Sequence, residues 1–523
     1  MPLKKILSYE NGKLDLSSKV FLILFIPASI YLLLILYLSF FWRVQLDHAM
    51  TFYVAFLADV YHKLPYKEIF DMNLPGTYLI HIIIGKIFGY SDLGIRFADV
   101  CILIGISSFT FAFLKRYGYK SATSFVVIFV ILYLTKRPYT IMQREYFIVA
   151  ILSVILFLNF RFSTDRKNII LLTGFLTGIC ATIKPHALII IPAFILYKFI
   201  EAKFIDKREN IFKYLFAYAL NLSLGAIIPI AIMFAWLVWS GTMNSFIDMV
   251  RYYFPLYADL NNTHYVVTGF QRYSYIMNEF FKFNEKPLFL VTAVIGAYFC
   301  LFRFELKKEQ RKQILLLCVL MAAFAVYTTL SGQYWPHHWL PCMYIVSILT
   351  SLCFIHSDKI FKREKYFVMF FLFAAGLSLF IPYKGFISQL KGGDVDVEQK
   401  QRVMEISDYV IKNAGPADDV QLLDWMGGTG EAMLRARKDH PNKFVYDFYF
   451  YHHVSNPYIQ SLKKEFIADL MTRKPKFIIK ILDKRPIPRG FDTSENFPEM
   501  DKYIEENYNI DVKGDGYLIF KKK

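Results

Sequence analysis

Residues 46–78 read LDHAMTFYVAFLADVYHKLPYKEIFDMNLPGTY and directly follow the first long apolar segment of the chain. This stretch combines acids, histidines and a Leu-Pro-Gly turn: Asp47, Asp59, Glu68, Asp71, His48, His62 and residues 74–76. Holding ionisable side chains at a bilayer surface costs free energy, so such a cluster is by default a hypothesis of a functional site. We expect an outer loop over residues 43–77, followed by a short amphipathic segment, residues 78–90, that lies in the membrane interface.

The composition indicates an integral membrane protein. Of 523 residues, 55% are hydrophobic and 18% are aromatic, whereas a soluble domain is typically about 45–50% apolar. The net charge of +17 could suggest a nucleic-acid partner. However, Lys and Arg fall in short clusters between apolar runs, which is a signal of membrane topology. We therefore expect no nucleic acid, and we expect membrane lipids as partners of the basic clusters.

The apolar runs predict eleven membrane-spanning helices, since a span needs about 20 apolar residues. In chain order they cover residues 20–42, 93–114, 121–135, 146–160, 168–183, 187–200, 214–239, 287–302, 314–330, 339–355 and 366–381. Lysines precede the first run, which we expect to be retained as a signal anchor, so the N-terminus is expected in the cytoplasm. Loops rich in Lys and Arg then fall inside, and loops rich in Tyr, Trp, His, Asp and Asn fall outside. The working face is therefore expected to be extracytoplasmic.

From about residue 382 the composition becomes that of a soluble domain. Periodicity predicts helices over residues 397–413 and 461–472, and strands over residues 420–424, 444–451 and 476–482. Alternating strands and helices suggest a small α/β domain outside the membrane, residues 383–523, after a transmembrane domain of residues 1–382. Residues 427–430, GGTG, follow a strand and could cradle phosphate. They lack the GxGxxG and GxxxxGK[ST] patterns, so a plain turn is favoured.

Asp47 is the first candidate for chemistry. It stands a few residues beyond the first helix, and a carboxylate in a partly dry cleft could accept a proton from a hydroxyl, as a general base must. The alternative is an interfacial acid that caps the next helix.

A second group of candidates gathers cationic or protonatable side chains at outer helix ends: Arg96, Arg144, Lys184, His337 and His338. Such groups hold phosphate oxygens and stabilise a departing phosphate. The alternatives are that Lys184 snorkels from a helix end, that Arg144 pairs with Glu145, and that the two histidines are interfacial anchors. Zinc binding by the histidines is disfavoured, because no Cys, carboxylate or third His lies at ligand spacing nearby. We predict no metal-ligand set, while a divalent cation such as Mg²⁺ or Mn²⁺ stays open.

These residues resemble a known group, the GT-C superfamily of membrane glycosyltransferases. The resemblance is to its bacterial branch, related to protein O-mannosyltransferases and to the lipid A aminoarabinose transferase (glycosyltransferase family 39-like), and it covers about residues 20–350. The matching stretches are Asp47, residues 66–78 (YKEIFDMNLPGTY), 88–96 (FGYSDLGIR), 143–145 (QRE), 174–192 (GFLTGICATIKPHALIIIP) and 336–338 (PHH).

The resemblance implies an inverting transfer of a sugar from a polyprenyl-phosphate donor to a hydroxyl of a glycan, lipid or protein. The reaction would take place at the outer face of the bacterial cytoplasmic membrane. By match, Asp47 is the base that activates the acceptor and Glu145 is the second acidic position. The donor-phosphate set is Arg144, Lys184, His337, His338 and Arg96, and the acceptor side adds Asp71, His48 and Tyr66.

Two departures from the family pattern stand out. His48 follows Asp47 where relatives often have Asp-Glu, and residues 73–76, NLPG, replace a common Lys-Pro-Pro. A phosphate-holding lysine is therefore missing there, and Lys63, Lys67 or Lys184 could substitute for it.

Two other functions compete with a transferase. A transporter or flippase of lipid-linked sugars predicts charges in the middle of helices and broken helices in paired halves, but the charges here cluster at helix ends. A non-catalytic partner in cell-envelope assembly would not need acids in this order in the outer loops. The donor sugar, the acceptor, the oligomeric state and the role of the C-terminal domain are left open.

Overall fold

The computed structural model describes residues 9–10, 13–136, 140–282, 287–354, 362–382, 385–393, 396–482 and 488–523. The chain forms two compact units. Unit 1 contains Met1–Phe40, Asp99–Ala231 and Glu279–Lys384, and unit 2 contains Phe41–Ala98, Ile232–Asn278 and Gly385–Lys523. The division falls inside three helices, namely α4 (Asp92–Leu114), α9 (Ile211–Trp239) and α12 (Gly269–Lys282). The expected domain boundary between residues 382 and 383 stays a prediction.

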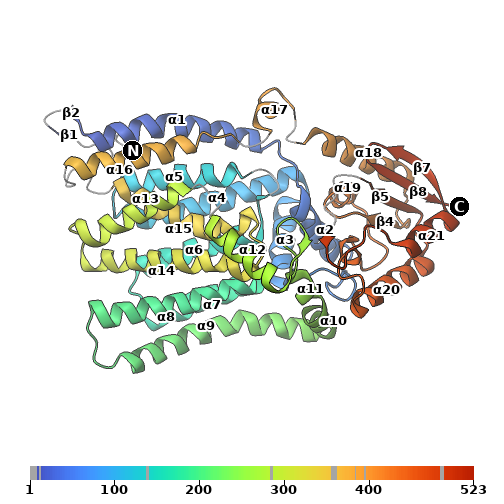
Figure 1. Ribbon diagram of the computed structural model, residues 1–523, viewed down its shortest axis with the longest axis horizontal. Coiled ribbons are helices and arrows are strands. Elements are labelled where there is room, and N and C mark those ends of the chain that lie inside the picture. The colour runs from blue at the N-terminus through green and yellow to red at the C-terminus, as the bar shows by residue number, and fades with distance from the viewer. Residues whose placement is uncertain are drawn as a thin grey trace. The chain divides into compact units, whose positions relative to one another are not determined.

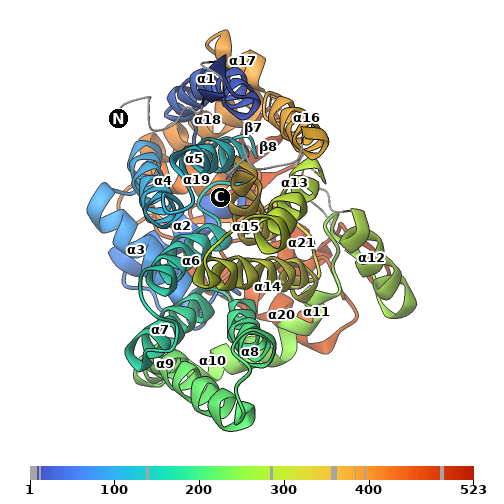
Figure 2. The same ribbon diagram turned by 90° about the vertical axis from the view of Figure 1, so that its left-hand side faces the viewer.

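Unit 1 is a bundle of helices that run side by side in Figure 1 and are seen end-on in Figure 2. In chain order they are α1 (Leu16–Ser39), α4 (Asp92–Leu114), α5 (Tyr119–Leu134), α6 (Arg144–Arg161), α7 (Lys167–Ile183), α8 (Ile190–Ile200), α9 (Ile211–Trp239), α13 (Pro287–Tyr298), α14 (Lys308–Ser331), α15 (Leu340–Ser351) and α16 (Lys362–Ser378). The 3-10 turns Pro185–Ile189 and Pro336–Trp339 precede α8 and α15. The short strands β1 (Tyr9–Glu10) and β2 (Lys13–Leu14) precede α1.

Each of the eleven apolar runs falls on a helix, but the count of eleven spans is not confirmed. Among the described residues, five helices are long and apolar enough to cross a membrane: Ser18–Ser39, Asp92–Leu114, Ile211–Trp239, Lys308–Ser331 and Pro336–Phe354. A sixth span results if Gly269–Lys282 and Pro287–Arg303, which meet at 66°, are one broken helix. Several other runs form shorter helices, such as the 16 residues of α5 and the 17 of α7. These fall below the length of about 20 residues that crosses a bilayer alone.

Glycines allow α7 and α9 to pack closely. A methyl group built on Gly174 would lie 2.0 Å from the carbonyl oxygen of Leu222, and one on Gly178 would lie 2.3 Å from that of Ala226. Small residues four apart permit such close approach of helix backbones. This contact fixes the end of α7, which carries Lys184.

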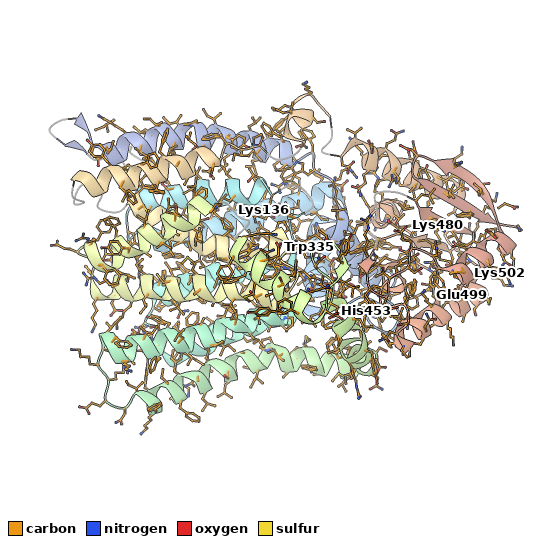
Figure 3. All side chains as sticks on the ribbon, viewed as in Figure 1. Lys136, Trp335, His453, Lys480, Glu499 and Lys502 are labelled. Atoms are coloured by element: carbon orange, nitrogen blue, oxygen red, sulfur yellow. The ribbon has the colours of Figure 1, made fainter. Side chains whose placement is uncertain are left out.

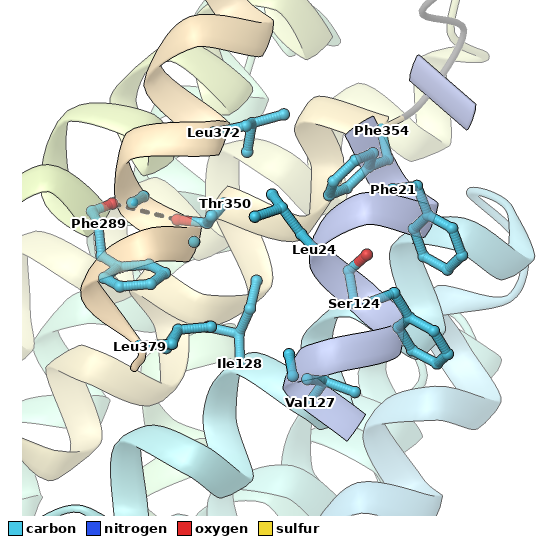
Figure 4. A pocket seen from close by; sticks show the side chains of 14 residues that line it. Phe21, Leu24, Ser124, Val127, Ile128, Phe289, Thr350, Phe354, Leu372 and Leu379 are labelled. Carbon is cyan, nitrogen blue, oxygen red and sulfur yellow. Dashed lines mark hydrogen bonds between the residues drawn. The ribbon is translucent and has the colours of Figure 1, made fainter. Parts of the chain in front are cut away.

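A small cavity of about 40 Å³ lies among α1, α5, α13, α15 and α16 (Figure 4). Its walls are almost entirely apolar, and the hydroxyl of Thr350 donates to the carbonyl of Phe289 at 3.1 Å. The volume would admit a water molecule, but a bound water needs two to four polar partners. The cavity therefore suits an apolar occupant and is distinct from the ionisable cluster described below.

Unit 2 combines helices with a four-stranded mixed sheet of order β4-β5-β8-β7, in which β4 and β5 are parallel and the other pairs are antiparallel. The strands are β4 (Val420–Leu423), β5 (Phe477–Ile481), β7 (Tyr508–Gly514) and β8 (Tyr517–Lys522), and β3 (Tyr265–Val266) pairs separately with β6 (Arg489–Gly490). Its helices are α2 (Leu46–Val60), α3 (Pro75–Phe88), α10 (Met243–Asp248), α11 (Phe254–Ala258), α12 (Gly269–Lys282), α17 (Phe386–Leu390), α18 (Val397–Asn413), α19 (Thr429–Ala436), α20 (Pro457–Arg473) and α21 (Pro498–Asn507). Lys480 of β5, which Figure 3 labels, donates to Asp501 of α21 at 2.6 Å.

Most elements expected after residue 382 are confirmed. The helices over residues 397–413 and 461–472 and the strands over residues 420–424 and 476–482 correspond to α18, α20, β4 and β5. Whether they form a separate extracytoplasmic domain stays a prediction.

Two local expectations are wrong. Residues 444–451 are not a strand but a loop with a 3-10 turn, Phe448–Phe450. Backbone groups there bond to non-strand partners: Phe444 N–H donates to the side chain of Asn442, and Asp447 N–H to the carbonyl of Asp424. The expected loop 43–77 also contains α2, because the apolar run from Phe52 to Leu57 is buried on all sides.

Candidate functional site

A cluster of buried ionisable side chains in unit 1 joins the ends of several helices. Glu145 lies in the first turn of α6, Lys184 caps the end of α7, Tyr327 belongs to α14, and His338 lies in the turn before α15. The Lys184 ammonium donates to Glu145 Oε1, and the Tyr327 hydroxyl donates to the same oxygen at 3.2 Å. His338 Nε2 lies 3.7 Å from this oxygen. The Glu145 side chain is 0% exposed and that of Lys184 is 6% exposed.

The local backbone explains why these charges stand where they do. A carboxylate is stabilised at a helix N-terminus and an ammonium at a C-terminus, which are the positions of Glu145 and Lys184. Pro185 and Pro336 each open a 3-10 turn, because proline fixes its own φ and has no N–H to satisfy. The second turn is held by Lys136, which donates to the carbonyl of Pro336 at 3.0 Å (Figure 3 labels Lys136 and the neighbouring Trp335).

Hydrogen bonds hold the His338 ring in place. Its Nδ1 lies 2.7 Å from the Ser331 hydroxyl, which in turn lies 2.9 Å from the carbonyl of Thr328. His338 Nε2 faces Glu145 Oε1. Glu145 Oε2 has no hydrogen-bond partner among the residues that the structure describes.

The cluster carries an excess of positive charge. Burial lowers the pKa of Lys184 to about 8, Glu145 opposes this shift, and the nearby half-buried Arg144 adds to it. Burial also lowers the pKa of His186 to about 4, so this imidazole is neutral at pH 7. At neutral pH, Lys184 is therefore mostly protonated and its charge is shared with Glu145.

The structure thus brings together five of the predicted site residues: Arg144, Glu145, Lys184, His337 and His338. Lys184 does not snorkel, since it is buried and ion-paired. Tyr327 and Ser331 also belong to the cluster, and no local pattern marks them because both lie in an apolar helix. The roles assigned to these residues stay predictions.

The other predicted residues belong to unit 2. Asp47 is half-buried in the first turn of α2, where the helix N-terminus favours a negative charge. His48 is 2% exposed and neither ring nitrogen has a hydrogen-bond partner in the described part of the chain. Its ring lies 5.4 Å from that of His81, and burial with this neighbour holds its pKa well below the usual value, so His48 is neutral. Arg96 is buried in α4, with its guanidinium carbon 5.5 Å from the centre of the Trp42 ring.

Asp71 is buried beneath a set of hydroxyl and amide donors. The hydroxyls of Tyr78 and Tyr446 donate to its two oxygens at 2.7 and 2.5 Å, and the Asn73 amide donates at 3.0 Å. The Tyr66 hydroxyl donates to the carbonyl of Asn73 at 2.6 Å. These contacts tie the loop that follows α2 to the 444–451 segment. Roles for Asp71 and Tyr66 on the acceptor side stay predictions.

The backbone amides of the glycine-rich turn, residues 427–430, bind the side chain of Asp424. Asp424 accepts from the N–H groups of Gly427 and Thr429 at 2.8 and 3.1 Å, and from the Thr429 hydroxyl at 2.8 Å. The amides that would cradle a phosphate are thus already bonded to a carboxylate. Gly428 has φ = +111°, a conformation that favours glycine. These contacts support the plain turn.

One group of side chains has the composition of a metal-binding site. Ligand atoms of Glu145, His337 and His338 all lie within 4.8 Å of one another. Reasoning from local spacing missed this carboxylate, because Glu145 is distant from the histidines in the sequence. Mg²⁺ prefers oxygen ligands in octahedral geometry, so one carboxylate and two imidazoles do not fit it.

Comparison with known proteins shows what fold the chain has. No family model and no curated protein sequence matches it. The structure of ArnT from Cupriavidus metallidurans bound to undecaprenyl phosphate matches at 10% identity and TM-score 0.60, over 95% of this chain and 97% of that one. The same protein in the apo state gives TM-score 0.55 at the same identity and coverage. The Archaeoglobus fulgidus oligosaccharyltransferase in the apo form matches at 12% identity and TM-score 0.47, over 89% and 70% of the two chains. ArnT is the lipid A aminoarabinose transferase, and at 10% identity the likeness shows that this chain shares the fold of ArnT.

Proposed function

We propose that this protein is an inverting glycosyltransferase that moves one sugar from a polyprenyl-phosphate donor to a hydroxyl acceptor. The reaction takes place at the outer face of the bacterial cytoplasmic membrane, and the acceptor is a glycan, a lipid or a protein. The observation that carries the proposal is the fold match with ArnT over 95% of the chain. That protein was crystallised with undecaprenyl phosphate, the kind of lipid that such a donor leaves behind.

The buried cluster of unit 1 supports the donor side of this reaction. When the sugar leaves, the lipid phosphate gains negative charge, and preorganised cations stabilise that charge in a water-poor site. Lys184 and Arg144 supply positive charge, and the imidazoles of His337 and His338 belong to the same cluster. The Lys184 ammonium is already paired with Glu145, so a donor phosphate competes with this carboxylate for it.

Asp47 serves the acceptor side. The acceptor hydroxyl attacks the anomeric carbon, Asp47 takes the hydroxyl proton, and the bond to the phosphate oxygen breaks with its electron pair on the oxygen. A positioned base of this kind contributes about 10²–10⁴-fold to the rate. His48, Tyr66 and Asp71 shape the acceptor side, and Arg96 remains a donor-side candidate.

The test replaces Asp47 by Asn in the full chain, reconstituted in lipid, and measures consumption of a radiolabelled polyprenyl-phosphate sugar. We expect the rate to fall at least 100-fold. The matched control is Asp59→Asn on the same helix, whose carboxylate pairs with Tyr90 and Lys86 and which should change the rate less than threefold. Full transfer by a correctly folded Asp47→Asn variant would refute the catalytic role.

The same assay separates the two competing functions. A flippase would move the labelled donor between leaflets without consuming it, and a non-catalytic partner would do neither. Donor consumption that depends on Asp47 would therefore exclude both.

A further inference from the structure

A buried carboxylate in α4 has no part in the proposed reaction. Asp99 is 0% exposed, although α4 is one of the helices apolar enough to cross a membrane. An ionisable side chain inside such a helix is costly, so it is by default a hypothesis of function. The hydroxyl of Tyr133 in α5 donates to Asp99 Oδ1 at 2.6 Å, and both residues belong to unit 1. Asp99 therefore orients a hydroxyl of the neighbouring helix.

The Tyr133 hydroxyl also binds the backbone that precedes α6. The N–H of Met142 lies 3.2 Å from the Tyr133 oxygen. A backbone N–H can only donate, so this oxygen accepts from Met142 and its own proton is directed to Asp99. The three residues thus form one chain of hydrogen bonds, in which the carboxylate sets the direction of the tyrosine hydroxyl.

The backbone that this hydroxyl holds is strained. Met142 has φ = +55° and is 1% exposed. The left-handed conformation is costly for a residue with a side chain, and it persists only where its surroundings hold it. Met142 stands two residues before Arg144, the first residue of α6. Without the Tyr133 hydroxyl, relaxation of Met142 to a negative φ would turn the chain immediately before Arg144 and Glu145.

The other flank of Arg144 and Glu145 is tied to the same residue of α4. Tyr146 is 0% exposed, and its hydroxyl donates to the backbone carbonyl of Asp99 at 2.9 Å. Its ring stacks on that of Tyr133, with the ring centroids 4.5 Å apart and the planes inclined by 9°. One residue of α4 therefore holds both flanks of the two charged residues at the start of α6.

We propose that Asp99 is a positioning residue that fixes residues 142–146. Its carboxylate acts through Tyr133, and the segment that it fixes carries Arg144 and Glu145. The effect on catalysis rests on the proposed transferase function, which places both charged residues in the site. The opposing explanation is that these hydrogen bonds only stabilise the packing of α4 and α5. In that case their loss would lower stability without moving residues 142–146.

The first experiment removes the hydroxyl and keeps the ring, in Tyr133→Phe. Hydrogen exchange of the backbone amides of residues 140–146 is followed by mass spectrometry on the full chain in detergent. We expect this exchange to be at least tenfold faster than in the unaltered chain. The matched control is Tyr344→Phe in α15, which loses a buried hydroxyl of the same unit, 2.7 Å from that of Thr110. The control should change the exchange less than twofold, and equal changes in the two variants overturn the proposal.

Two variants of Asp99 test the carboxylate itself. Asp99→Asn keeps an oxygen that can accept from Tyr133, whereas Asp99→Ala does not. Exchange of residues 140–146 should stay within threefold of the unaltered chain for Asp99→Asn and rise at least tenfold for Asp99→Ala. The proposal is overturned if the two variants exchange equally fast.

The second experiment measures consumption of a radiolabelled polyprenyl-phosphate sugar by the full chain in lipid. Tyr133→Phe should lower the rate at least tenfold, and Tyr344→Phe less than threefold. Adding Met142→Gly to Tyr133→Phe should raise the rate again at least threefold, because glycine adopts a positive φ as readily as a negative one. A glycine would not repair a general loss of stability, so an absent recovery overturns the proposal, as does an unchanged rate in Tyr133→Phe.

The two experiments separate this proposal from the proposed function. If the unaltered chain consumes no donor, the transferase function fails. The exchange measurements need no donor, and they still decide whether Asp99 and Tyr133 fix residues 142–146.

Discussion

Replacing either Glu145 or Lys184 should destabilise the protein far more than replacing both. Both side chains are almost fully buried, so each single variant leaves a charge without a partner in a water-poor interior. Breaking a buried pair in this way costs about 3–5 kcal/mol, whereas replacing both members by neutral residues of similar volume is often neutral. We expect the low end, about 3 kcal/mol, for Glu145→Gln and for Lys184→Met, because the group left behind can shift its protonation. The double variant should lose about 1 kcal/mol or less.

These free energies translate into measurable shifts of the melting temperature. The entropy of unfolding is about 2.1 cal/mol/K per residue near 60 °C, which gives roughly 1.1 kcal/mol/K for a chain of this length. Each single variant should therefore melt about 3 °C lower, and the double variant within about 1 °C of the unaltered chain. The assay follows intrinsic fluorescence of the full chain in detergent during heating.

A surface pair provides the control for this cycle. Lys502 and Glu506 lie 3.9 Å apart and are 76% and 60% exposed (Figure 3 labels Lys502). Exposed pairs contribute little to stability, so Glu506→Gln should shift the melting temperature by less than 1 °C. The reasoning is refuted if the effects of the two single variants simply add in the double variant, or if they are no larger than that of the control.

Two further predictions concern unit 2. Burial raises the pKa of the Glu431 carboxyl, and the nearby Arg43 guanidinium lowers it by a smaller amount, so that the pKa is about 8. The folded pKa thus lies above the unfolded value, so the stabilisation is complete below about pH 4.5 and is lost as the pH rises through 8. The melting-temperature difference between the unaltered chain and Glu431→Gln should therefore shrink from pH 6 to pH 9, and a constant difference would contradict this. In the glycine-rich turn, Asp424→Asn replaces one accepting carboxylate oxygen by a donating amide group. This change should lower the free energy of unfolding by about 1–3 kcal/mol and the melting temperature by about 1–3 °C. An unchanged melting temperature would show that the three hydrogen bonds to Gly427 and Thr429 contribute nothing to stability.

Part of the fold and of the cluster could be predicted because it follows from the local pattern of apolar and charged residues along the sequence. The α18 helix spans the predicted residues 397–413 because its apolar residues recur at helical spacing on one face. Arg144, Glu145 and Lys184 were identified because charges at helix ends interrupt long apolar runs. Nothing local marks Tyr327, which is one of two aromatic residues in α14 and matters only because α6 and α7 approach it. The 444–451 segment was misjudged for the same reason, since its aromatic residues are buried by long-range packing rather than by pairing as a strand.

The residues of the cluster also explain why the number of spans was hard to predict. A buried carboxylate or ammonium is costly unless it is paired, so Glu145 and Lys184 are tolerated only where two helix ends meet. Such charges at a helix end shorten the apolar run. The α6 helix begins with Arg144 and Glu145, α7 stops at 17 residues before Lys184, and neither qualifies as a span. The Pro336–Phe354 helix carries the two histidines and has the lowest mean hydropathy of the five that do qualify. Two of the helices that build the cluster, α6 and α7, therefore fall short of the apolar length of a span because their ends carry the charges of the cluster.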